Sequence, residues 1–99
     1  MSDMPFHPLR VPAQAVEHGG DEIMRAVIAN GGLYLSLKRA FDDPEGWGRA
    51  LAEVVKHVSQ IYATETKYNK AEAAKRMLDI FAQEVATGEG SPVPGVAKN

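Results

Sequence analysis

The sequence predicts an α+β fold, a small ββαα domain in which an antiparallel β-hairpin packs on two amphipathic helices. An apolar-rich run precedes an Asn-Gly pair and a run of alternating apolar and polar residues follows it, and two longer segments further along carry apolar residues at helical spacing. A length of 99 residues accommodates one domain, and a composition of 44% hydrophobic and 24% charged residues is typical of a globular chain.

The hairpin is predicted from strands at about residues 22–29 and 33–38. Asn30-Gly31 is the expected loop, because both positions tolerate positive φ, although a loop at Gly31-Gly32 is an alternative. With Asn30-Gly31 as the loop, Ile28 lies opposite Leu33. One face of the hairpin, here called the leucine face, then carries six apolar residues: Met24, Ala26, Ile28, Leu33, Leu35 and Leu37.

Two helices are predicted at about residues 44–65 and 70–87. Asn69 and Glu72 form a capping box at the start of the second helix, and the link between the helices could itself be helical, which would give one long kinked helix. Apolar residues recur every three or four positions in both segments. In the first they are Trp47, Leu51, Val54, Val58 and Ile61, and in the second Ala71, Ala74, Leu78, Phe81 and Val85.

The ends of the chain are predicted to lie outside this 22–87 domain. Residues 1–21 form an extended leader, because Pro5, Pro8 and Pro12 exclude a long helix. Residues 88–99 are rich in Gly, Pro and Ser and predict a flexible tail.

The acidic turn before the first helix has two interpretations. Asp43 can cap the helix ahead of Pro44, or Asp42 can cap it with Glu45 as the return half of a capping box. The three carboxylates could instead bind a divalent cation, but the turn lacks the glycine-spaced ladder of a calcium hand. We interpret it as a cap, and predict no metal site.

A second hypothesis places a small-ligand or catalytic pocket near Trp47, His57 and Tyr62. His57 could act as a general base oriented by Glu53, and glycines at 46 and 48 could serve either packing or a pocket beside the tryptophan. No nucleophile, oxyanion-hole motif or phosphate loop accompanies them. We therefore predict no catalytic residue and no cofactor.

Nucleic-acid binding is a third hypothesis, based on Arg25, Lys38 and Arg39. The basic residues of the second helix alternate with Glu65, Glu72 and Asp79, and the net charge is −2. This is typical of a mixed solvated surface, so we expect no nucleic-acid partner.

The run GGLYLSLKRAFDDPEGWGRALAEVVKHV, Gly31 to Val58, resembles a family of short, mainly alphaproteobacterial proteins of unassigned function. The resemblance implies a bacterial origin and a similar ββαα layout. It brings no ligand or catalytic residue to this chain.

The face of the hairpin opposite the leucine face predicts how the protein acts. A two-stranded sheet is marginal in water and has unpaired edges, so joining two hairpins into one sheet would stabilise both. We expect a homodimer with the interface Ile23, Arg25, Val27, Tyr34 and Ser36. The alternative is a monomer whose leader, from Leu9 to Val16, covers the open edge.

The absence of cysteine, of a long apolar segment and of a signal-peptide pattern indicates a soluble cytoplasmic protein with no membrane partner. The sequence thus favours a non-enzymatic interaction or adaptor module that self-associates through its hairpin.

Overall fold

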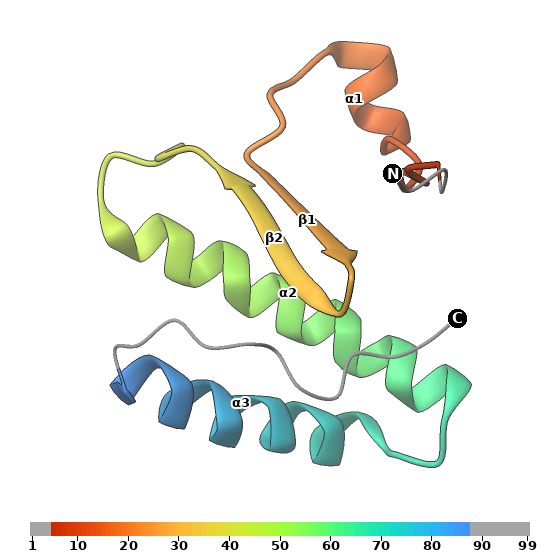
Figure 1. The fold of residues 1–99 in the computed structure, drawn as a ribbon, viewed down its shortest axis with the longest axis vertical. Helices are drawn as coiled ribbons and strands as arrows, with labels where there is room; N and C mark the ends of the chain where they lie inside the picture. Colours follow the sequence, from red (N-terminus) through yellow and green to blue (C-terminus); the bar gives the residue numbers. More distant parts are fainter. Residues whose placement is uncertain (1–4, 88–99) are drawn as a thin grey trace.

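A computed structural model describes residues 5–87 of the chain. A short helix α1 (Ala13–His18) precedes strands β1 (Met24–Ala29) and β2 (Gly32–Leu37), and helices α2 (Pro44–Glu65) and α3 (Lys70–Thr87) follow them (Figure 1). The predicted α+β arrangement of a hairpin followed by two helices is confirmed. The bounds of α2 and α3 coincide with the predicted ranges, and the link between them is not helical, so the alternative of one kinked helix is wrong.

The hairpin turns at Asn30 and Gly31, whose φ angles are 51° and 76°. Positive φ at both positions is what a two-residue turn needs in order to match the twist of the strands. The strands pair antiparallel with Ile28 opposite Leu33, Ala26 opposite Leu35 and Met24 opposite Leu37. The predicted register is therefore confirmed.

Helix α2 begins where the acidic turn ends. The Asp43 carboxylate accepts a hydrogen bond from the backbone N–H of Gly46 at 3.2 Å, and Pro44 occupies the first turn, where its missing N–H costs nothing. Of the two predicted caps, the structure uses Asp43 and not Asp42. Helix α3 is capped in the same way, by Asn69 accepting from the N–H of Glu72 at 2.8 Å.

Helices α2 and α3 form an antiparallel pair (Figure 1). The two buried residues of the described chain lie on these helices, and both are small: Ser59 is 0% exposed and Ala73 is 5% exposed. The Ser59 hydroxyl donates to the carbonyl of Val55 at 2.7 Å, so its burial leaves no polar group unsatisfied. Small side chains allow two helix backbones to approach closely.

The leader is not extended throughout, because residues 13–18 form α1 directly after Pro12. Proline fits this position because the first turn of a helix needs no N–H from it. The segment from Leu9 to Val16 does not cover the hairpin edge either: Leu9 is 94% exposed, Val16 is also exposed, and no Cα of α1 lies within 8 Å of another described helix or strand. The alternative of a leader that covers the edge is therefore wrong.

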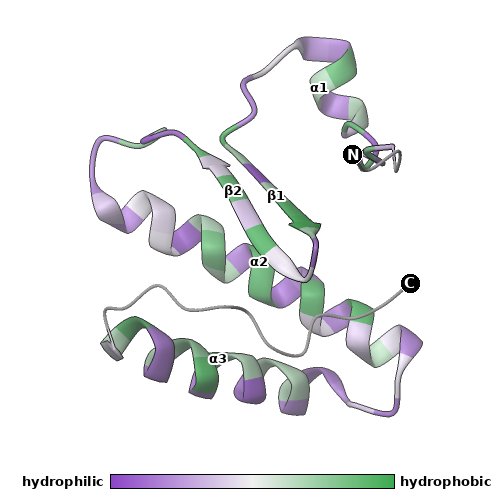
Figure 2. Cartoon of the chain, viewed as in Figure 1, coloured by the Kyte–Doolittle hydropathy of each residue, from purple (hydrophilic) through white to green (hydrophobic). Residues whose placement is uncertain are grey.

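The leucine face of the hairpin is covered less than the sequence predicts. No Cα of β1 or β2 lies within 8 Å of a Cα of α2 or α3, and Ile28, Leu33, Leu35 and Leu37 are 43–58% exposed. Figure 2 shows hydrophobic positions on both the hairpin and the helices. Folding of one chain thus leaves much apolar surface in contact with water.

Candidate interaction surface

The five residues predicted to form an interface do lie on one face of the hairpin. Arg25 pairs across the strands with Ser36, and Val27 pairs with Tyr34. Just beyond the strands, the N–H of Lys38 donates to the carbonyl of Ile23 at 3.2 Å, which extends the same ladder by one pair. Val27 and Ile23 are half-buried, whereas Tyr34 is exposed.

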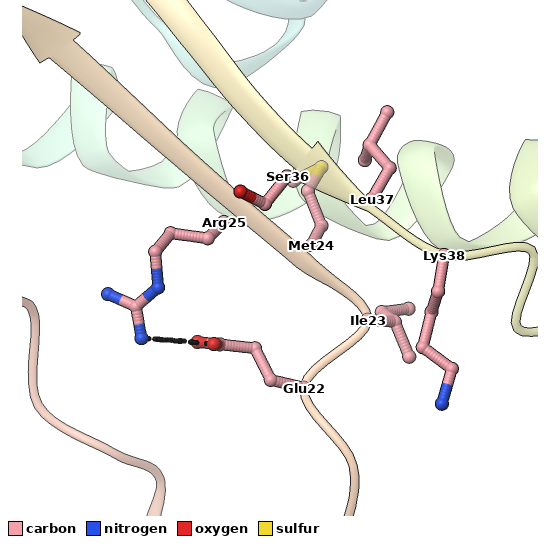
Figure 3. A pocket seen from close by; sticks show the side chains of 7 residues that line it. All are labelled: Glu22, Ile23, Met24, Arg25, Ser36, Leu37 and Lys38. Carbon is pink, nitrogen blue, oxygen red and sulfur yellow. Dashed lines mark hydrogen bonds and ion pairs between the residues drawn. The ribbon is translucent and has the colours of Figure 1, made fainter.

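Charged side chains surround the open end of the hairpin (Figure 3). Arg25 donates to both carboxylate oxygens of Glu22 at 3.0 Å, and its guanidinium lies 5.5 Å from the centre of the Phe6 ring. Lys38 lies 3.9 Å from the carboxylate of Asp21. An open hollow between these groups is lined by Glu22, Ile23, Met24, Arg25, Ser36, Leu37 and Lys38. Arg25 and Lys38 are thus each matched by an acid of the same chain.

The register also determines which backbone groups point outward from the hairpin. The bond between Lys38 and Ile23 and the two-residue loop identify one set of pairs as hydrogen-bonded across the strands, with Val27 and Tyr34 among them. In the alternating pairs the N–H and C=O groups point away from the partner strand. These outward groups belong to leucine-face residues, Met24, Ala26 and Ile28 on β1 and Leu33, Leu35 and Leu37 on β2. Since β1 and β2 form a two-stranded sheet, no third strand among the described residues pairs with either edge.

The junction between β2 and α2 is built around Phe41, which the sequence analysis did not identify. Its ring meets the Trp47 ring edge-on, with centroids 5.8 Å apart, and a Cβ on Gly46 would come within 3.0 Å of it. The Trp47 indole N–H donates to the carbonyl of Arg39 at 2.8 Å. Gly46 therefore serves packing, whereas nothing lies within 4 Å of the corresponding position at Gly48.

The fold does not bring together Trp47, His57 and Tyr62, the residues of the second predicted site. Fifteen residues of one helix separate the tryptophan from the tyrosine, which is about 22 Å along the axis. Tyr62 instead meets Tyr68 edge-on, with centroids 6.0 Å apart. His57 Nδ1 lies 2.7 Å from the backbone carbonyl of Glu53, and the Glu53 carboxylate accepts from Lys56 at 2.9 Å. The expected carboxylate–histidine pair is thus replaced by a contact with the main chain.

Four basic residues of the hairpin and the second helix lie beside acidic or aromatic partners. Lys75 pairs with Asp79 at 2.7 Å, and the Arg76 guanidinium lies 5.1 Å from the Tyr68 ring centre. Together with the pairs at Arg25 and Lys38, these contacts give each of the four cations a partner within the same chain. Within residues 5–87, these contacts do not favour the merged basic patch that the hypothesis requires.

Neither a cluster of metal ligands nor a membrane-spanning helix occurs in residues 5–87. No group of three His, Asp or Glu side chains in this range is placed to hold a metal ion. No helix in the same range has the length and apolar character required to cross a bilayer.

The chain matches the sequence family described as a domain of unknown function, DUF5076, over residues 8–88. This chain belongs to that family. The predicted resemblance to short bacterial proteins without an assigned activity is thereby confirmed, and the match extends beyond the Gly31–Val58 run into the leader and the whole of α3. No curated protein matches the chain.

A solved structure from the photosynthetic bacterium Rhodopseudomonas palustrus CGA009 is similar to this DUF5076 member. The two share 32% sequence identity and superpose with a TM-score of 0.65, over 86% of this chain and 99% of that chain. That protein carries a provisional description as a pyruvate dehydrogenase. Because nearly all of it aligns with this chain, the two are of similar length.

Proposed function

We propose that this protein is a non-enzymatic interaction module of the bacterial cytoplasm that forms a homodimer through its hairpin. The observation that carries the proposal is the exposed state of the hairpin. Its two edges have outward-pointing backbone groups, and the apolar side chains of Ile28, Leu35 and Leu37 are more than half exposed. A two-stranded hairpin in this state is marginal in water.

Joining two hairpins edge to edge would give the unpaired backbone groups of one edge partners, and would enlarge the marginal two-stranded sheet. The backbone donors and acceptors of one edge would pair with those of the second copy, and the combined sheet would have four strands. Val27 and Tyr34 lie opposite each other near the middle of the hairpin. In a four-stranded sheet their side chains would lie on one face, beside the side chains of the added strands.

We do not extend the description of the Rhodopseudomonas protein to this chain. A dehydrogenase requires a cleft that encloses its substrate and cofactor. The hollows found among residues 5–87 are open to solvent, and the one on the hairpin is lined by acids and bases that already pair with each other. The geometry therefore favours an interaction surface over a catalytic one.

The first test is molar mass by light scattering over a hundredfold dilution. We expect about twice 10.7 kDa at low concentration for the native chain, and 10.7 kDa for Val27→Glu and Tyr34→Glu, because a two-fold join places the new carboxylates of both copies on one face of the sheet, where like charges repel. Gln60→Glu, on the exposed face of α2, is the matched control for an added charge. A native chain that is monomeric at every concentration would refute the proposal.

Proline substitutions then identify the edge that pairs. Leu35→Pro removes an outward N–H of β2, and Ala26→Pro removes an outward N–H of β1, while the bonds inside the hairpin are kept. We expect one of the two variants to dissociate. Leu35→Ala, which shortens the side chain and keeps the N–H, separates loss of the hydrogen bond from loss of apolar contact. Dimers that survive both prolines would show that association does not use the sheet edges.

A further inference from the structure

Helix α3 carries a second apolar surface that the hairpin proposal does not use. The residues Ala71, Ala74, Leu78, Phe81 and Val85 recur at spacings of three, four, three and four, and they are here called the α3 seam. This is the 3.5-residue repeat with which one helix packs along another. The sequence predicts that the seam faces the interior of the domain.

The structure places the contact with α2 elsewhere on the helix. Ala73 is buried and Met77 is half-buried, so these residues mark the side of α3 that meets α2. Leu78, Phe81 and Val85, the three large residues of the seam, are 49–65% exposed. Ala74 is half-buried, but within residues 5–87 the large side chains of the seam are open to a partner.

The sequences of the terminal segments outside residues 5–87 do not match the pattern of the seam. Residues 88–99 read GEGSPVPGVAKN, with two valines as the only large apolar side chains among three glycines and two prolines. Residues 1–4 add two methionines. Neither segment has the repeat of apolar residues that would match a seam of five positions.

A second copy of the seam does match it. We propose that α3 packs antiparallel against α3 of another copy, with Leu78 on the two-fold axis. This arrangement sets Ala74 opposite Phe81 of the second copy and Ala71 opposite Val85 of the second copy. Each small residue then faces a large one, which fills space evenly along the contact.

A parallel pairing would fit less well. It would set Phe81 against Phe81 of the second copy and Ala74 against Ala74 of the second copy, so that one layer is crowded and the next leaves a void. The antiparallel contact is also isologous, since the same residues are used by both chains, and it closes as a pair.

The contact is small and should be weak. Five residues over two heptads bury less than the roughly 800 Å² per partner of a standard stable interface. The helix is already formed within each domain, so pairing does not have to order it first. We expect association through the α3 seam to be reversible by dilution at concentrations where the hairpin contact persists.

This inference rests on the proposed function in one respect: with the hairpin join, each chain has two separate self-association surfaces. A chain with two isologous contacts assembles beyond a dimer. The native protein should therefore show a mass above twice 10.7 kDa at high concentration and fall to the dimer on dilution.

The test replaces Leu78 by Glu and compares it with Ile80→Glu. Both side chains are large and about half exposed, at 53% and 54%, but only Leu78 belongs to the seam. We expect L78E to remain a dimer at every concentration, while I80E assembles like the native chain. Circular dichroism of both variants checks that α3 is still folded. Equal masses for L78E and the native chain would overturn the proposal.

Single cysteines report the direction of the helices, because the native chain contains none. Ala71→Cys and Val85→Cys chains, mixed under mild oxidation, should form the mixed disulfide in preference to either homodimer. Rapid formation of the Ala71→Cys homodimer would contradict the antiparallel contact.

The two proposals fail separately. Tyr34→Glu removes the hairpin contact and should leave a weak dimer that Leu78→Glu then abolishes. If Y34E has no effect, the hairpin proposal is wrong and the α3 seam can still be tested by L78E. If L78E has no effect on either background, the seam proposal alone is wrong.

Discussion

Phe41 is the residue that organises the junction between the hairpin and the helices. Its ring lies against the first turn of α2, where it contacts Gly46 and meets the Trp47 ring edge-on. The glycine is needed because any side chain there would overlap the ring, although glycine inside a helix costs about 1 kcal/mol relative to alanine. The second glycine of this turn, Gly48, has no such neighbour within 4 Å.

The two glycines should therefore respond in opposite directions to alanine. Gly48→Ala should raise the free energy of unfolding by up to about 1 kcal/mol, because it gains helix propensity in open space. Gly46→Ala should lower it by about 1–3 kcal/mol, because the new methyl group overpacks the Phe41 ring. Urea denaturation followed by circular dichroism measures both.

A double variant tests whether the Phe41 ring is the reason that Gly46→Ala is destabilising. Phe41→Ala removes the ring, so adding Gly46→Ala to that background should no longer be destabilising. Equal stabilisation by both glycine substitutions in the native background would show that the ring does not occupy this position.

The residues of this junction differ in how far the sequence could predict them. The Asp43-Pro44 start of α2 follows from local chemistry, since an acceptor before a proline is a helix start in most contexts. The role of Phe41 depends on a turn in which Ala40 adopts a φ of 58°. Contacts made across such a turn have no periodicity, so no pattern in the sequence indicates them.

At the scale of the elements, the pairing of α2 with α3 shows a different limit on what the sequence can predict. The spacing of apolar residues correctly locates both helices, but it defines an apolar arc wider than one neighbour can cover. The closest packing falls at Ser59 and Ala73, at the margin of the predicted stripes, because small residues let the backbones approach. Periodicity therefore predicts that a helix has a buried side, and not which part of the arc its partner occupies.

The solvent side of α2 carries an ion pair whose effect can be measured directly. Lys56 donates to the Glu53 carboxylate at 2.9 Å, and this hydrogen bond and the lysine's charge lower the pKa of Glu53 below its usual 4.5. Replacing the lysine in Lys56→Gln should raise the pKa of Glu53. A carboxyl-carbon NMR titration of both chains measures the change, and an unaltered pKa would contradict the pair.

The sign of the pH dependence follows from the direction of each pKa. Because the pKa of Glu53 is lower in the folded chain, its stabilising effect is present above the usual value and is lost as the pH falls through the folded value. The pKa of Lys56 is raised, so its effect is lost as the pH rises through its folded value. Both groups are exposed to solvent, so the stability change should be small and should shrink further in salt.

At the scale of the whole molecule, the unusual feature is the core. Large aliphatic and aromatic side chains normally fill the interior of a domain, yet within residues 5–87 the buried positions are a serine and an alanine. The sequence indicated enough apolar residues for a core and correctly gave the elements that carry them. It could not indicate whether the leucine face and the helical stripes are covered by the same chain, because an apolar pattern is the same for a core and for an interface.

A protein whose apolar surface is covered by other copies should become more stable as its concentration rises. If folding and association are linked, a tenfold increase in concentration adds about 1.4 kcal/mol per dimer, or about 0.7 kcal/mol per chain. For a domain of this size that corresponds to a rise in Tm of roughly 3–6 °C.

Thermal unfolding followed by circular dichroism over a hundredfold range of concentration should show this rise in the native chain. Tyr34→Glu combined with Leu78→Glu removes both proposed contacts, so its Tm should be lower and independent of concentration. A native Tm that does not change with concentration would mean that the single chain is stable with its apolar surface exposed, and that self-association does not stabilise the fold.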